Sequence, residues 1–165
     1  MAFRIRRVGH LVLRVKDIDR SKHFFQEILG FPVVAENERG MFFFSTDVKD
    51  NHHMLAIVQA KEGAAMPTSD HVGMQHVSFE LGNFAELQEA YRLFKEKDVN
   101  IHYTTFHGVA KSIYFHDPDG NLLEVYCNVP PEEYRKSVSN AYSRHGAIED
   151  ELEGKIPQKP GTVAP

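Results

Sequence analysis

Two segments of the chain alternate apolar and polar side chains and match each other in sequence. They run over residues 9–15 and 75–81, and each carries a histidine at its second position, His10 and His76. The first, third and fifth residues after each histidine are apolar and lie on one face of the segment, whereas the histidine lies on the other face. The pattern therefore predicts two strands, each with an apolar face for a helix to cover and a histidine on the other face.

A helix is predicted after each strand. Asp17 or Asp19 is a candidate N-cap in the first copy, and Gly30 is placed to end that helix. Asn83 followed by Glu86 resembles a capping box in the second copy. The apolar positions at helical spacing are Phe24, Phe25, Ile28 and Leu29 in the first helix and Phe84, Leu87, Tyr91 and Phe94 in the second.

Further β-like runs follow each predicted helix. They cover 31–36, 41–46 and 53–59 in the first copy, and 99–105, 112–116 and 122–127 in the second. Each copy is then a βαβββ module, and such a module leaves one sheet face bare until it meets another. We therefore expect an α+β fold in which two modules pair into an open, U-shaped mixed β-barrel with helices outside and the histidine faces inside.

One domain is predicted over residues 1–130, with module one at about 7–60 and module two at about 73–128. Residues 131–165 are expected to form a C-terminal helix and a flexible tail. The helix would carry Tyr134, Val138 and Tyr142 on one side.

The composition and charge of the chain limit the kinds of molecule that it is expected to bind. The chain is 42% hydrophobic and 25% charged, with a formal net charge of -4, which argues for a folded core and against nucleic acid binding. Cys127 is the single cysteine, so no intrachain disulfide can form. No run reaches membrane-spanning length and the N-terminus lacks an apolar leader. These features predict a cytoplasmic protein that acts on a small molecule, away from membranes.

Three residues carry the candidate chemistry in a chain with ten histidines. His10 and His76 occupy matched positions, and Glu124 interrupts an apolar run where an unpaired charge is costly. Two imidazoles and one carboxylate form the facial triad of non-haem Fe(II), although the same donors accept Mn(II), Co(II), Ni(II) or Zn(II). The alternative for each histidine is an ordinary hydrogen-bonded residue, and for Glu124 the solvated side of an edge strand.

These features resemble the vicinal oxygen chelate superfamily over residues 7–130. The resemblance lies in the repeated βαβββ module, the histidine pair and the Asp-Pro-Asp-Gly turn at 117–120 that precedes Glu124. The run from Thr105 to Glu124, with His107 and Tyr114 inside it, is similar to the signature of the type I extradiol ring-cleavage dioxygenases. Residues 51–56 resemble the segment in which those enzymes carry an acid/base histidine.

The resemblance implies a one-domain extradiol dioxygenase that cleaves a catechol-type diol with O2. It implies that His10, His76 and Glu124 bind Fe(II), with Mn(II) as an alternative. It assigns acid/base chemistry to His53 and substrate contact to His107 and Tyr114. Pleat alternation lets only one of His52 and His53 face the site. Candidate ring contacts are Phe42, Phe44 and Phe106.

Three other functions remain open besides the dioxygenase. A glyoxalase-type isomerase would need a fourth ligand, for which Gln59 is the candidate, and a fosfomycin-type transferase would use the same triad on Mn(II). A metal-free resistance protein would only bind its ligand. Whatever the activity, the alternative for His53 and for His107 is an ordinary surface position, and for Tyr114 a place in the core. Many extradiol dioxygenases have twice this length, so the segment after Pro131 or a neighbouring subunit is expected to cover the site, and a homo-oligomer is predicted.

Overall fold

The computed structural model describes residues 3–66, 68, 72–131 and 147–155. Residues 1–66 and 67–165 form two compact units, and each is described by itself. No helix among the described residues is long and apolar enough to cross a membrane. The predicted helix with Tyr134, Val138 and Tyr142 lies outside the described residues.

Unit 1 is a four-stranded mixed sheet with one helical segment. In the sheet order β1-β4-β3-β2, β1 runs parallel to β4 and the other neighbours are antiparallel. The elements are β1 (Leu11–Val15), α1 (Ile18–His23), η1 (Phe24–Ile28), β2 (Val33–Glu36), β3 (Phe42–Phe44) and β4 (Leu55–Gln59).

The helical segment of unit 1 starts as predicted and then widens. Asp17 is the N-cap, and its side chain accepts from the Arg20 amide at 3.0 Å. After α1 the chain makes a π-helical turn, η1, in which the Leu29 amide donates to the Phe24 carbonyl at 3.1 Å. Gly30 ends the segment with a φ of 68°, a conformation that glycine adopts without strain.

Unit 2 repeats this plan. Its sheet order is β5-β8-β7-β6, again with one parallel pair, β5 and β8. The predicted α+β fold class, built from two βαβββ modules, is therefore confirmed. The elements are β5 (Val77–Leu81), α2 (Phe84–Glu96), β6 (Ile101–Phe106), β7 (Ala110–His116), β8 (Leu122–Asn128) and α4 (Glu149–Leu152).

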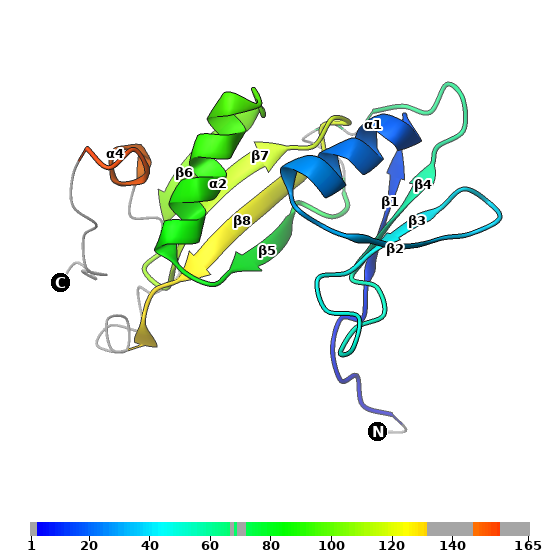
Figure 1. Cartoon of the computed structure of the whole chain (residues 1–165), viewed down its shortest axis with the longest axis horizontal. Coiled ribbons are helices and arrows are strands. Elements are labelled where there is room, and N and C mark those ends of the chain that lie inside the picture. The colour runs from blue at the N-terminus through cyan, green and yellow to red at the C-terminus, as the bar shows by residue number, and fades with distance from the viewer. Residues whose placement is uncertain (1–2, 67, 69–71, 132–146, 156–165) are drawn as a thin grey trace. The chain divides into compact units, whose positions relative to one another are not determined.

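Helix α2 covers one face of the second sheet (Figure 1). The predicted N-cap forms, because Asn83 accepts from the Glu86 amide at 3.1 Å. Glu86 reaches back one residue beyond the N-cap and accepts from the Gly82 amide at 2.8 Å, where a capping box would bond the Asn83 amide. Phe94 of α2 packs on Phe115 of β7 with ring centroids 4.6 Å apart. Within the described part of unit 2, α4 also lies on the α2 side, so the opposite face of the sheet is left for a site.

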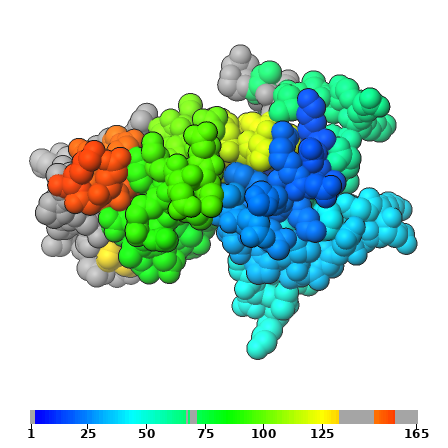
Figure 2. All heavy atoms as spheres, turned by 45° about the horizontal axis from the view of Figure 1, so that its top comes forward, coloured from blue at the N-terminus to red at the C-terminus, as the bar shows by residue number. Residues whose placement is uncertain are grey.

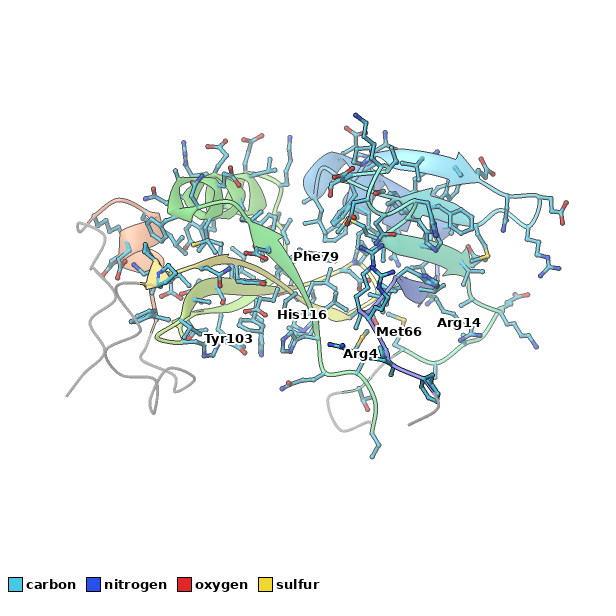
Figure 3. All side chains as sticks on the ribbon, turned by 90° about the horizontal axis from the view of Figure 1, so that it is seen from below. Arg4, Arg14, Met66, Phe79, Tyr103 and His116 are labelled. Atoms are coloured by element: carbon cyan, nitrogen blue, oxygen red, sulfur yellow. The ribbon has the colours of Figure 1, made fainter. Side chains whose placement is uncertain are left out.

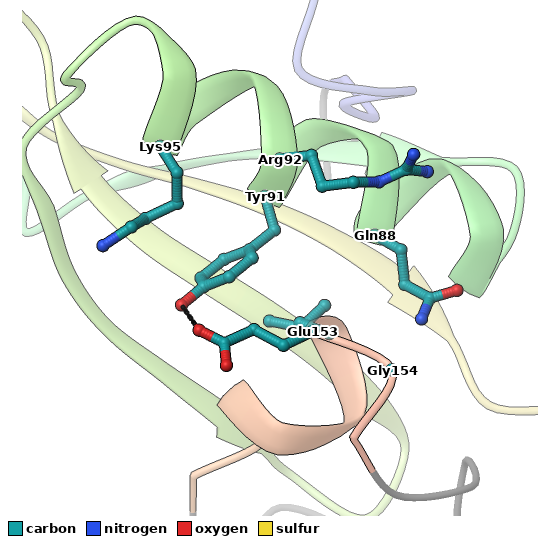
Figure 4. A pocket seen from close by; sticks show the side chains of 7 residues that line it. Gln88, Tyr91, Arg92, Lys95, Glu153 and Gly154 are labelled. Carbon is teal, nitrogen blue, oxygen red and sulfur yellow. Dashed lines mark hydrogen bonds between the residues drawn. The ribbon is translucent and has the colours of Figure 1, made fainter.

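The short helix α4 packs against α2 (Figure 2). Glu151 accepts a 2.6 Å hydrogen bond from Lys111 Nζ, and both side chains are buried. Tyr91 of α2 donates to Glu153 at 3.3 Å (Figure 4). Helix α4 is therefore held to the helix-covered side of unit 2 by a buried ion pair.

Candidate metal centre

Unit 2 brings two of the predicted metal ligands together. His76 immediately precedes β5, and Glu124 lies on the neighbouring strand β8, where Ser78 is its register partner. His76 Nε2 is 3.3 Å from Glu124 Oε2. The Ser78 hydroxyl donates to the same carboxylate oxygen. Because the Glu124 side chain is only 8% exposed, this carboxylate is a buried charge that needs such partners.

The turn before β8 fixes the orientation of Glu124. The Gly120 amide donates to the Asp117 carbonyl at 3.0 Å, and Gly120 has a φ of 80°. Asp117 Oδ1 accepts from the amides of Asp119 and Asn121, although burial raises the pKa of the Asp117 carboxyl. Since side chains alternate along β8 and Leu123 is buried, Glu124 is directed to the face opposite α2.

Tyr114 and His107 join the same cluster. Tyr114 is the register partner of Glu124 on β7, and its hydroxyl hydrogen-bonds the Glu124 carboxylate. Burial first, and then the bond to Glu124, raise the pKa of Tyr114, so the phenol stays protonated at neutral pH. His107 Nε2 is 3.3 Å from the Tyr114 oxygen. A continuous polar chain therefore runs from His107 through Tyr114 to Glu124.

Aromatic rings hold Tyr114 in place. Tyr103 stacks on the Tyr114 ring with centroids 4.4 Å apart and planes 18° apart, and the His76 ring meets Tyr114 edge-on at 5.3 Å. Figure 3 shows Tyr103 and His116 on the side of the sheet away from α2. Sequence analysis gave no role to Ser78 or Tyr103. The period-2 alternation that places Ser78 on the same face as His76 was the signal available for Ser78.

A cavity of about 370 Å³ opens beside this cluster. It is lined by Ser78, His107, Tyr114, Glu124 and Tyr126, with Val109 and Ala110 as its apolar wall. Its size falls in the range of small-molecule sites.

A cavity of about 460 Å³ lies on the other side of unit 2, between α2 and α4 (Figure 4). No imidazole is among its lining residues, and Arg92 in its wall already pairs with Glu89. The smaller cavity therefore carries the candidate chemistry.

Unit 1 brings together the third predicted ligand and the predicted acid/base residue. The rings of His10 and His53 lie 4.4 Å apart between centroids, and Phe43 meets His53 edge-on at 5.3 Å. His53 is half-buried, whereas His52 is exposed and contacts His53 through their Nδ1 atoms. Burial, with smaller contributions from His10 and His52, lowers the pKa of His53. His53 is thus the member of the pair that lies against His10.

The donor set of unit 2 fits a divalent metal. Metal bonds of about 2.1 Å place neighbouring donor atoms roughly 3.0–3.4 Å apart, and His76 Nε2 and Glu124 Oε2 are 3.3 Å apart. His76 Nδ1 is buried without a partner among the described residues. Taken alone, neither unit gathers three His, Cys, Asp or Glu ligands within its described part. His10 as the third ligand stays a prediction.

The predicted ring contacts are wrong. Phe44 packs on Phe25 of the helical segment, and Lys22 Nζ of α1 lies over the ring of Phe42, so both phenylalanines face the helix side. Phe106 is the register partner of Lys111 and lies on the α2 side of its sheet. The cause is strand register, since β3 directs Phe43 to the side of His53 and its neighbours to the core.

Gln59 is engaged in unit 1 and fits poorly as a fourth ligand. Its Oε1 accepts from the Ile18 amide at 3.0 Å, and its Nε2 donates to the Lys16 carbonyl at 2.6 Å. The Gln59 side chain therefore anchors the start of α1, which weighs against a glyoxalase-type centre.

The chain is similar in sequence to curated proteins with several different activities. The chain is 31% identical over 131 residues to biphenyl-2,3-diol 1,2-dioxygenase 3 of Rhodococcus globerulus, covering 77% of this chain and 67% of that one. It is 25% identical to catechol-2,3-dioxygenase of Bacillus subtilis, spanning 82% of this chain and 46% of that protein's length. It is 27% identical to metallothiol transferase FosB of Staphylococcus saprophyticus, over 74% of this chain and 77% of that one.

Solved structures show the same fold. A glyoxylase/bleomycin resistance protein/dioxygenase domain from Frankia sp. EAN1pec matches with a TM-score of 0.65 and 17% identity, covering 76% of this chain and 99% of the Frankia chain. The model of the Glyoxalase/Bleomycin resistance protein/Dioxygenase superfamily matches residues 7–125, which include His10, His76 and Glu124. This chain therefore belongs to the Glyoxalase/Bleomycin resistance protein/Dioxygenase superfamily.

Proposed function

We propose that this protein is an extradiol dioxygenase that opens a catechol-type ring beside its diol with O2, at Fe(II) held by His10, His76 and Glu124. The observation that carries the proposal is the cluster in unit 2. A carboxylate and an imidazole stand 3.3 Å apart at a cavity whose wall also holds a protonated phenol and a second imidazole. Fe(II), when bound, supplies the electron transfer between the diol and O2.

Each residue of the cluster has a task that its surroundings support. Tyr114 stays protonated, and its single hydroxyl proton, which bonds Glu124 in this structure, would turn to a diol oxygen in the cavity once Glu124 holds the metal. His107 holds that hydroxyl in place from the other side, at 3.3 Å. Outside this cluster, His53 of unit 1 has a lowered pKa and is neutral at pH 7, so the proposal assigns to it the base that accepts a proton from the diol and returns it later.

A transferase acting on Mn(II) is the second candidate, because the chain covers more of the length of the FosB relative than of the two dioxygenases. The hydrogen-bonded pair of His107 and Tyr114 favours the dioxygenase, since it places a donor over the cavity where a diol oxygen would lie. The competing activities use different co-substrates and can be measured side by side.

The test loads the purified protein with Fe(II) or Mn(II) without oxygen. One assay follows O2 consumption and the absorbance of ring-opened product with 4-methylcatechol. Parallel assays follow thiol addition to fosfomycin and isomerisation of a glutathione hemithioacetal. We expect oxygen uptake stoichiometric with ring opening on Fe(II), and neither parallel reaction. Activity confined to either parallel assay would overturn the proposal.

A further inference from the structure

The cavity of unit 2 extends along the sheet beyond the proposed metal ligands. Ser78 and Glu124 are register partners, and the next pair on the same face is Glu80 with Tyr126. Residues two apart on a strand are separated by about 7 Å. Tyr126 lines the cavity, so the cavity reaches from the Glu124 row to this second row and on to Ala110, the register partner of Asn128.

The carboxylate of Glu80 is fixed beside that second row. Tyr126 donates its hydroxyl to Glu80 Oε2 at 3.4 Å, and Asn128 Nδ2 donates to Glu80 Oε1 at 2.5 Å. Both donors come from β8, so Glu80 on β5 is drawn across the sheet towards the cavity wall. Two hydrogen bonds to one side chain give the charge a defined position although Glu80 is exposed.

The described lining of the cavity supplies no cationic side chain. None of the residues that line it is Lys or Arg. Lys111 belongs to β7 but points to the opposite face, where its Nζ pairs with Glu151 and lies 4.7 Å from the Phe84 ring centroid. Glu80 is therefore a carboxylate held directly behind Tyr126 of the described cavity lining, and the proposed chemistry does not use it.

We infer that Glu80 is a specificity-determining residue that directs the site to diols with an uncharged or cationic ring substituent and disfavours a carboxylate substituent. The inference rests on the proposed function. A diol bound at the Glu124 row places a substituent on the far side of its ring near the Glu80 row. There an anionic group meets a like charge, and a protonated amine meets an opposite one.

The experiment uses three catechols of similar size: 4-methylcatechol, 3,4-dihydroxybenzoate and 4-(2-aminoethyl)catechol. Binding to the Fe(II)-loaded protein is measured by calorimetry without oxygen, and kcat/KM is measured with oxygen. In Glu80→Gln, affinity for the benzoate relative to 4-methylcatechol should rise roughly three- to eightfold, as expected for a charge about 7 Å away in a solvated site. Affinity for the amine should fall by a similar factor.

Two further variants separate a local effect of the Glu80 charge from a general change in charge or stability. Glu96→Gln makes the same charge change at an exposed position of α2 and should leave all three ratios unchanged. Glu80→Lys should reverse the order and favour the benzoate, a gain that partial unfolding cannot produce. Unchanged ratios in both Glu80 variants, with 4-methylcatechol still bound and cleaved, would overturn the inference alone. Failure of all three catechols to bind or react would overturn the proposed function and this inference with it.

Discussion

Individual side chains at the candidate site derive their chemistry from their neighbours. The His53 ring lies against His10 and is half-buried, and its lowered pKa follows from lost hydration and from two nearby imidazoles. Tyr114 shows the opposite effect, because burial next to a carboxylate favours its neutral form. A neutral base and a protonated donor are thus available at the same pH.

The acid/base role of His53 is tested by His53→Gln. Glutamine keeps the polarity and approximate size of the ring but cannot take up a proton, so kcat should fall about a hundredfold or more while the metal content stays the same. Turnover and metal stoichiometry are measured on the same sample. His52→Gln, at the exposed neighbour, is the matched control and should run near the wild-type rate. If metal-replete His53→Gln had the kcat of wild type, His53 would not be the acid/base residue.

A buried ion pair attaches helix α4 to strand β7. Lys111 and Glu151 are 2% and 8% exposed, so removing either partner leaves the other as an uncompensated buried charge. Two apolar side chains of similar size would avoid that penalty. The pair therefore contributes little net stability itself but makes single substitutions costly.

We expect Glu151→Gln to lower the free energy of unfolding by about 3–5 kcal/mol, measured by urea denaturation. The double variant Lys111→Met/Glu151→Met should recover most of that loss. Glu89→Gln, which breaks the exposed pair with Arg92, should cost less than about 1 kcal/mol. If Glu151→Gln cost no more than Glu89→Gln, the structural role assigned to α4 would be wrong.

Short sequence patterns predicted where helices and strands begin, but they did not predict which side chains pack against each other. The N-caps at Asn83 and Asp17 are properties of a few adjacent residues, and both form. The burial of Lys111 could not be predicted, because its partner Glu151 lies 40 residues away on another element. The same limit explains the wrong assignment of Phe42 and Phe44. Alternation shows that they share a face but cannot say which face the helix covers.

The candidate ligands were recognisable because the sequence repeats. His10 and His76 precede equivalent strands β1 and β5, and Glu124 interrupts the apolar run of β8. The pairing of His76 with Glu124 follows from strand register, which the sequence does not state. Tyr103 was missed because stacking on Tyr114 depends on the bulge between Ile101 and Tyr103 in β6. The homo-oligomer and the covering role of residues after Pro131 stay predictions.

At the scale of the whole molecule, a bound metal should stabilise the fold. A ligand that binds only the native state, at a free concentration of about 100 times its Kd, adds about 2.7 kcal/mol. For a chain of this size that corresponds to a rise in Tm of roughly 5–10 °C. Thermal unfolding with Fe(II) under argon, and again after chelation, measures the shift. Glu124→Gln should abolish it and Glu96→Gln should preserve it. An identical Tm with and without metal would contradict a tightly bound ion.

We propose that one ion is held by His10 of unit 1 and by His76 and Glu124 of unit 2. Anaerobic calorimetric titration of Fe(II) into wild type, His10→Ala, His76→Ala and Glu124→Ala tests it most directly, with His23→Ala as the control at an exposed histidine of α1. We expect one ion per chain in wild type and in the control, and a loss of affinity of more than about a hundredfold in each of the three variants. Wild-type affinity in His10→Ala would contradict it.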